Sequence, residues 1–145
     1  MDAQAVHRVF ALPMGNAPIP YEKNSAALTF TQFYEVVGHE EDQRAPTFSE
    51  AEQWLLTEGK GSTNDRWLKY WLAFAISSFL CPTSSEKLCI RAFHAIADTT
   101  KIGDYNWCRL VVQKLIKGIS DVKGGKRKFT SGCLFFLTVS PCCLL

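Results

Sequence analysis

Hydrophobic residues at helical spacing mark the beginning of the chain. Val6, Val9 and Phe10 recur three or four positions apart, so residues 3–12 are predicted to form a short helix that ends before Pro13. The eight residues that follow contain three prolines, which is typical of a loop. A second helix is predicted to start at Thr47, because Thr47 and Glu50 have the spacing of a capping box and an apolar side follows them.

The most hydrophobic stretch spans residues 65–82, where apolar side chains occupy nearly every side of a helix. Asp65 is predicted to cap this helix and Pro82 to end it. A helix that is apolar all round is either buried or crosses a membrane. The unbroken apolar run is shorter than the roughly 20 residues that a membrane span needs. We therefore predict a central buried helix with Trp71 in the core.

Further amphipathic patterns predict helices over residues 83–98, 104–121 and 131–139. Asp104 is a candidate cap for the second of these helices. The clearest has its apolar positions on one face: Cys108, Val111, Val112, Leu115 and Ile119. Residues 27–37 are ambiguous, because their aromatic and β-branched content suits a strand while their spacing favours a helix. The sequence predicts an all-α fold, an irregular bundle of about six helices around one central buried helix.

Charge is distributed unevenly along the 145 residues. Residues 1–65 contain ten acidic and four basic side chains, whereas residues 66–145 contain four acidic and twelve basic ones. The two halves could neutralise each other within one fold, or the basic half could face an acidic partner. The densest basic cluster is KGGKRK, which supplies four candidate nucleic-acid or nuclear-import contacts: Lys123, Lys126, Arg127 and Lys128. The alternative is a solvated loop between helices.

No residue pattern predicts catalysis, a metal or a cofactor. His94 and Asp98 are one helical turn apart and could orient an imidazole, but such a pair is usually structural. The spacing of the cysteines and His94 fits no zinc pattern. The amino terminus has no secretory signal pattern, so we expect the six cysteines to be free thiols in a reducing compartment. Four of them are predicted to serve as small hydrophobic core residues: Cys81, Cys89, Cys108 and Cys133.

The final residues, SPCCLL, formally match a prenylation motif with Cys142 as the acceptor. Any apolar tail with a cysteine four positions from the end passes this test. The apolar run before Pro141 is also shorter than half a membrane span. We predict that residues 140–145 form a frayed tail without lipid or metal.

Several blocks resemble a known family: AVHRVFALPMGNAPIPY, FLCPT, ADTTKIGDYNWC and GCLFFL. Residues 4–139 are similar to the transposon-associated plant mobile domain of grasses, whose members often carry the label "aminotransferase-like". The resemblance implies a helical domain of mobile-element origin. The aminotransferase label gains no support from this chain, which has no lysine in a recognisable pyridoxal-phosphate setting.

From these observations we expect one helical domain over residues 1–139, incomplete at both ends relative to the family, followed by the divergent apolar tail 140–145. We expect a non-enzymatic protein without cofactors that acts through protein–protein contact, as a regulator, a toxic factor or a competitor of full-length relatives. Nucleic-acid binding is the alternative. We further expect an intracellular protein, nuclear or cytoplasmic, without a transmembrane segment, in which exposed apolar surface could also drive self-association.

Overall fold

Helices form the regular structure of this protein, whose computed structural model describes residues 2–21, 33, 44–57, 64–82 and 84–139. The described α-helices are α1 (Ala3–Phe10), α3 (Phe48–Thr57), α4 (Asp65–Ala75), α5 (Phe93–Ile96), α6 (Trp107–Lys123) and α7 (Leu134–Val139). A π-helix, η1 (Ile76–Leu80), continues α4, and two 3-10 helices, η2 (Ile90–Ala92) and η3 (Thr99–Asp104), flank α5. The described part contains isolated β-bridges but no strand, which confirms the predicted all-α class.

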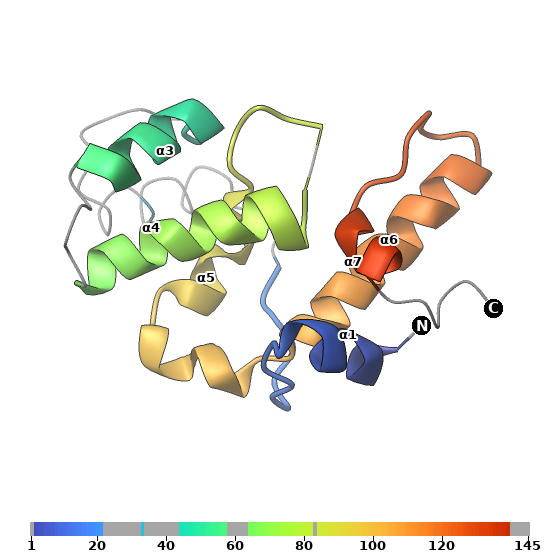
Figure 1. Cartoon of the computed structure of the whole chain (residues 1–145), viewed down its shortest axis with the longest axis horizontal. Helices are drawn as coiled ribbons and strands as arrows, with labels where there is room; N and C mark the ends of the chain where they lie inside the picture. Colours follow the sequence, from blue (N-terminus) through green and yellow to red (C-terminus); the bar gives the residue numbers. More distant parts are fainter. Residues whose placement is uncertain (1, 22–32, 34–43, 58–63, 83, 140–145) are drawn as a thin grey trace.

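The helices form two neighbouring groups (Figure 1). Helix α4 packs against α3 and α5, whereas α1 packs against α6 and α7. The loop after α1 lies against the segment that precedes α6, where Met14 and Ala17 form bridges with Asn106 and Tyr105. The largest fully buried side chains come from both groups: Val6, Phe33, Tyr70, Phe93, Ile96, Val111, Leu115 and Phe136.

Helix starts follow local capping chemistry, although two of the predicted caps are wrong by one or two residues. The capping box of α3 is confirmed, since Thr47 N–H donates to Glu50 at 2.7 Å and Glu50 N–H donates to the Thr47 hydroxyl at 3.2 Å. Helix α4 is capped by Asn64 rather than Asp65, whose carboxylate instead binds Lys69 and Thr99. Similarly, Asn106 caps α6 by accepting a hydrogen bond from Arg109 N–H, where Asp104 was predicted.

Helix α4 is buried on one side only, so its predicted central burial is wrong in that respect. Tyr70 and Ala73 face the core, while Trp71 is 44% exposed. The reason is that α3 and α5 pack on α4 without enclosing it. On the uncovered side the Trp71 ring stacks on Trp67 at 6.4 Å, so each indole shields part of the other from water.

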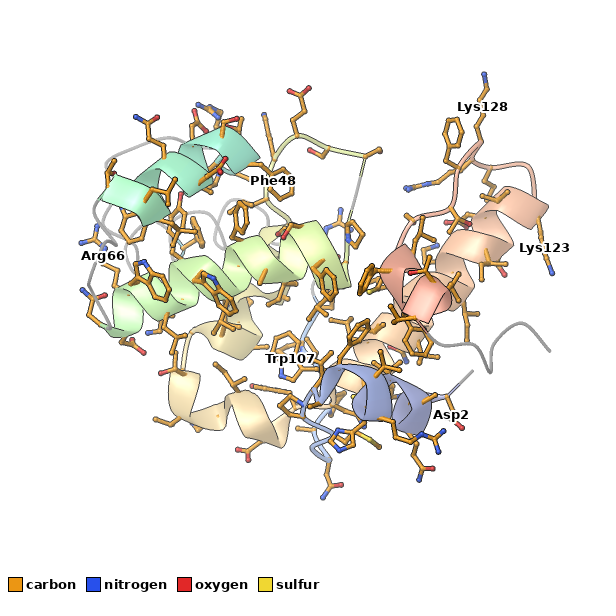
Figure 2. The ribbon with its side chains drawn as sticks, viewed as in Figure 1. Asp2, Phe48, Arg66, Trp107, Lys123 and Lys128 are labelled. Atoms are coloured by element: carbon orange, nitrogen blue, oxygen red, sulfur yellow. The ribbon has the colours of Figure 1, made fainter. Side chains whose placement is uncertain are left out.

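The predicted helix over residues 83–98 is much shorter in the structure. Residues 84–89 are not helical, and only η2 and the four-residue α5 follow. Tertiary pairing explains the difference: Leu88 N–H donates to Pro46 O at 2.8 Å, and Phe48 N–H donates to Glu86 O at 3.0 Å. This pairing holds residues 86–88 beside the start of α3, at the place where Phe48 lies in Figure 2.

Two other predictions fall wholly or largely outside the described residues. Of the ambiguous segment 27–37, only Phe33 is described, and it is helical and buried. The predicted tail 140–145, with Cys142, also lies outside them. The last described helix starts at Leu134 instead of residue 131, because Gly132 has φ of 107°, which a right-handed helix does not allow.

Candidate functional site

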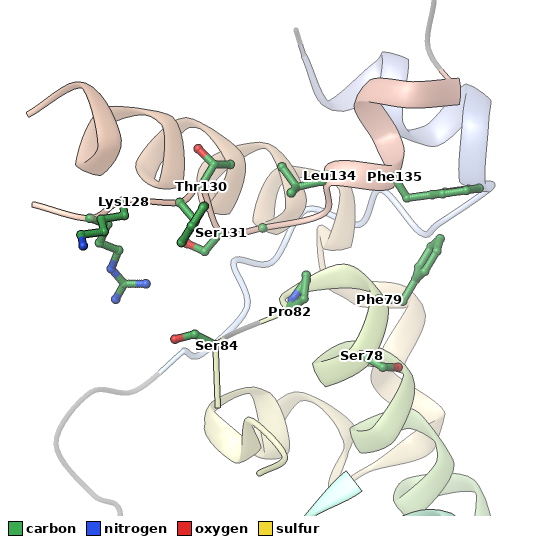
Figure 3. A pocket seen from close by; sticks show the side chains of 12 residues that line it. Ser78, Phe79, Pro82, Ser84, Lys128, Thr130, Ser131, Leu134 and Phe135 are labelled. Carbon is green, nitrogen blue, oxygen red and sulfur yellow. The ribbon is translucent and has the colours of Figure 1, made fainter. Parts of the chain in front are cut away.

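A groove of about 520 Å³ opens between the two helix groups. Figure 3 shows Ser78, Phe79, Pro82 and Ser84 on one side and the segment from Lys128 to Phe135 on the other. The volume lies within the range of about 300–1,000 Å³ that is typical of ligand pockets. The twelve lining residues include two cations and no carboxylate.

The first wall is built by the π-helix η1. Cys81 N–H donates to Ile76 O at 2.7 Å, five residues back, so the chain is wider here than in an α-helix. The Ser77 and Ser78 hydroxyls donate to the carbonyls of Ala73 and Phe74, at 2.7 and 2.8 Å. These bonds satisfy backbone carbonyls at the point where the helix changes from α to π hydrogen bonding. The result is a turn that holds the Phe79 ring 39% exposed at the groove.

The second wall depends on two glycines that let the chain lie directly against α6. A Cβ on Gly118 would lie 2.1 Å from Ser131 O, which no side chain tolerates. Gly132, in its left-handed conformation, approaches Leu115 closely enough that a Cβ would meet its Cα at 3.1 Å. This contact fixes the segment from which Leu134 and Phe135 emerge at the groove.

Aromatic rings join the walls at one end of the groove. Phe79 lies 5.4 Å from both Phe10 and Phe135, measured between ring centroids, and Phe136 lies 5.9 Å from Phe10. Phe136 is fully buried, but Phe135 remains 52% exposed. Phe129, further along the groove, is 83% exposed. Exposed apolar side chains that gather in this way are typical of binding surfaces.

The predicted basic cluster lies at the other end of the groove. Arg127 and Lys128 line it, whereas Lys123 and Lys126 are exposed on the same turn without lining it. Lys123 and Lys128 point away from the body of the molecule in Figure 2. The turn is closed by Asp121 O, which accepts from the backbone N–H groups of residues 126 and 127. No ion pair between described residues involves any of the four cations.

Of the His94 and Asp98 pair that was weighed for catalysis, Asp98 is engaged by its own neighbours in the chain. The Asp98 carboxylate accepts from Thr100 and pairs with Lys101 at 3.1 Å, so it does not serve to orient His94. Within the described ranges, no group of three or more metal-binding side chains exists.

The four cysteines behave largely as predicted. Cys81, Cys108 and Cys133 are buried, and burial raises the pKa of the Cys81 thiol to about 12. A thiol with so high a pKa is a poor nucleophile. Cys89 is only half-buried, because its sulfur lies at the edge of the core, 3.1 Å from the Tyr21 hydroxyl. A core role is therefore confirmed for three of the four.

A second hollow, of about 530 Å³, follows the outer face of α6. Its central cation is already engaged, since Lys114 Nζ lies 3.2 Å from the centroid of the Tyr21 ring. Burial lowers the pKa of Lys114. The groove is therefore the stronger candidate.

Sequence reasoning found Arg127 and Lys128 but missed the apolar residues of the groove. The sequence pattern predicts Phe79 in the buried helix over residues 65–82 and Phe135 in the helix over residues 131–139. One available signal was the position of Phe129, a bulky aromatic residue directly after KGGKRK and outside any periodic pattern. The other residues join the groove only through tertiary contacts.

The described residues form a small helical domain with an open groove, lined in part by exposed apolar side chains. The chain belongs to a family described as a domain of unknown function (DUF8566), whose family model matches residues 1–138. Neither the curated proteins nor the solved structures contain a match to it. Among the described helices, none combines the length and the apolar character needed to cross a membrane.

Proposed function

We propose that this protein is a non-enzymatic interaction domain of mobile-element origin whose groove binds a protein partner. The observation that carries the proposal is the exposure of Phe79, Phe129 and Phe135 along one hollow. Aromatic side chains dominate the binding energy of protein interfaces, particularly where a pocket removes them from water. Burial of their apolar surface contributes a favourable free energy of about 25 cal/mol for each Å² removed from water.

The groove also suits regulation by competition. It lies on elements distant in sequence, η1 and the segment after α6, and is already shaped in the free chain. A preformed surface loses little conformational entropy on binding. A domain of this kind could bind partners of longer plant mobile domain relatives and exclude those relatives from them.

A capture experiment with two matched variants tests the proposal. Phe129→Glu places a charge in the groove, and Leu56→Glu places the same charge on α3, where Leu56 is 64% exposed outside it. Tagged wild-type protein and the Leu56→Glu control should recover the same proteins from plant tissue. Recovery by Phe129→Glu should fall about tenfold, as expected for an interface hot spot. Equal recovery by all three proteins would contradict the proposal.

Nucleic-acid binding is the second candidate, and a specific observation favours it. Residues 105–139 contain seven basic side chains and one acidic one, and the exposed Phe129 ring adjoins Arg127 and Lys128. Proteins that bind single strands combine cations with exposed rings in this way. Retention of a single-stranded oligonucleotide on filters should then fall steeply with salt. Absence of salt-sensitive retention would exclude this function.

A further inference from the structure

The distribution of charge along the groove identifies the chemistry of its occupant. We infer that the groove binds a short acidic segment of another protein, in which an aromatic or leucine side chain stands next to carboxylates. This inference rests on the proposed function and specifies the partner. The apolar side chain would enter beside Phe79, Leu134 and Phe135, and the carboxylates would contact Arg127 and Lys128.

Within the part of the chain that the structure describes, the cations at the groove form no ion pair with a carboxylate. Asp121 is the one acidic residue between positions 105 and 139. Its carboxylate pairs with Lys117 at 3.4 Å, on the preceding turn of α6. Arg127 and Lys128 line a hollow without any acidic residue, and Lys123 and Lys126 add to the positive potential. A partner that supplies carboxylates meets this potential with a complementary one.

The apolar end explains why charge alone does not describe the occupant. The ring centroids of Phe79 and Phe135 lie 5.4 Å apart, and both rings also pack against the half-buried Phe10 ring. Leu134 adds a side chain that is 45% exposed. Pro82 and the Ser78 and Ser84 side chains complete the facing wall. An apolar anchor fits there, whereas a purely acidic segment would leave these surfaces in water.

A single strand of nucleic acid fits this arrangement less well. Its phosphates recur at every nucleotide and need cations along the whole track. Here both lining cations are neighbours in sequence at one end, and the wall formed by Ser78, Phe79, Pro82 and Ser84 carries no charge. One charged end and one apolar end match a peptide with acidic and apolar parts.

Selection from a phage-displayed library of random 12-residue peptides tests the inference on the full chain. Peptides enriched on the wild-type protein should carry Asp or Glu beside Phe, Trp or Leu. The affinity of a selected, fluorescein-labelled peptide should fall about tenfold or more for Arg127→Glu with Lys128→Glu. The control, Lys87→Glu with Arg109→Glu, changes the net charge equally at exposed positions outside the groove and should retain most of the affinity. Selection on the charge-reversed variant should instead enrich Lys and Arg.

The outcomes distinguish a failure of the acidic-peptide inference from a failure of the proposed function. If enriched peptides lose binding in Phe129→Glu but show no preference for acids, the proposed function stands and the acidic partner is wrong. If binding of labelled dT12 depends on Phe129 and binding of no peptide does, the proposed function and the inference are both wrong, and nucleic acid is the ligand. The chain could instead form a dimer that Phe129→Glu abolishes and that the selected peptides do not disrupt. In that case the occupant is a second copy of the chain and the inference is wrong.

Discussion

Two clusters of aromatic rings pack the two sides of the molecule, and they differ in how far water reaches them. Around α4, Tyr70 stacks on Trp54 at 4.4 Å and Phe33 contacts Phe93 at 5.3 Å, and all four rings are buried. Around α1 and α7 the rings also contact one another, at somewhat longer centroid distances of 5.4 to 6.3 Å. There, however, two of the rings face the groove.

Under the proposed function, aromatic rings serve two purposes in this molecule. The cluster around α4, here called the closed cluster, places its rings where burial stabilises the fold and leaves no surface for a ligand. The open cluster buries Phe136 but leaves about half of Phe135 in water, so part of its apolar surface contributes nothing to folding. That surface remains available to a partner. Substitutions in the two clusters should therefore separate stability from binding.

The largest effect is expected in the closed cluster. Phe93→Ala removes a ring that is 2% exposed and leaves a cavity next to Phe33. It should lower the free energy of unfolding by about 3–5 kcal/mol, which is typical of buried phenylalanine truncation. Urea unfolding followed by circular dichroism measures the change. An unaltered midpoint would show that this cluster does not support the fold.

The next effect concerns the contact between α6 and the second wall. Gly118→Ala should lower the free energy of unfolding by about 1–3 kcal/mol, because its Cβ meets the backbone of Ser131 and the wall must move. Gly103→Ala is the control, since nothing lies within 4 Å of its Cβ. Peptide affinity should fall for the first variant and persist for the second. Equal stability of the two would contradict the close approach.

A smaller loss of stability is expected in the open cluster. Phe135→Ala should cost about 1–2 kcal/mol, because only about half of the side chain is removed from water. Its loss of peptide binding should exceed that of any variant of the closed cluster that still folds. A stability loss as large as that of Phe93→Ala would mean that both clusters are core.

The sequence predicted the elements that local chemistry decides. The capping box at Thr47, the buried face of α6 and the all-α class follow from spacing and capping. Burial of α4 could not be predicted in the same way, since an apolar pattern surrounds Trp71 whereas α3 and α5 leave its side chain 44% exposed. Trp71→Ala should accordingly cost less than Phe93→Ala.

The candidate site was predictable only at its charged end. Four cations in six residues are visible in KGGKRK. The apolar end is assembled by the π-helix and by the contact of Gly132 with α6, both of which depend on tertiary packing. Similarly, residues 84–89 are not helical, and residues 86–88 within them pair with residues 46–48, far away in the sequence. Single-sequence patterns contain no record of such pairings.

The smallest expected effect is a pH dependence of the free energy of unfolding. It arises at the start of α3, at the edge of the closed cluster. Hydrogen bonds from Arg44 and from Thr47 N–H lower the pKa of Glu50 from its ordinary value of 4.5 to about 2. Because the folded state favours the ionised carboxylate, its contribution is complete above about pH 4.5 and is lost as the pH falls toward 2. The pair is exposed, so solvent screening limits the contribution to below about 1 kcal/mol.

Glu50→Gln keeps an acceptor for the capping box and removes the charge. Its urea midpoint should lie slightly below that of the wild type at pH 6, and the two midpoints should converge between pH 4.5 and 2. Glu52→Gln, at an exposed position on the same helix, should follow the wild type throughout. A difference that persists undiminished at pH 2 would show that packing, and not the carboxylate charge, secures the start of α3 over the closed cluster.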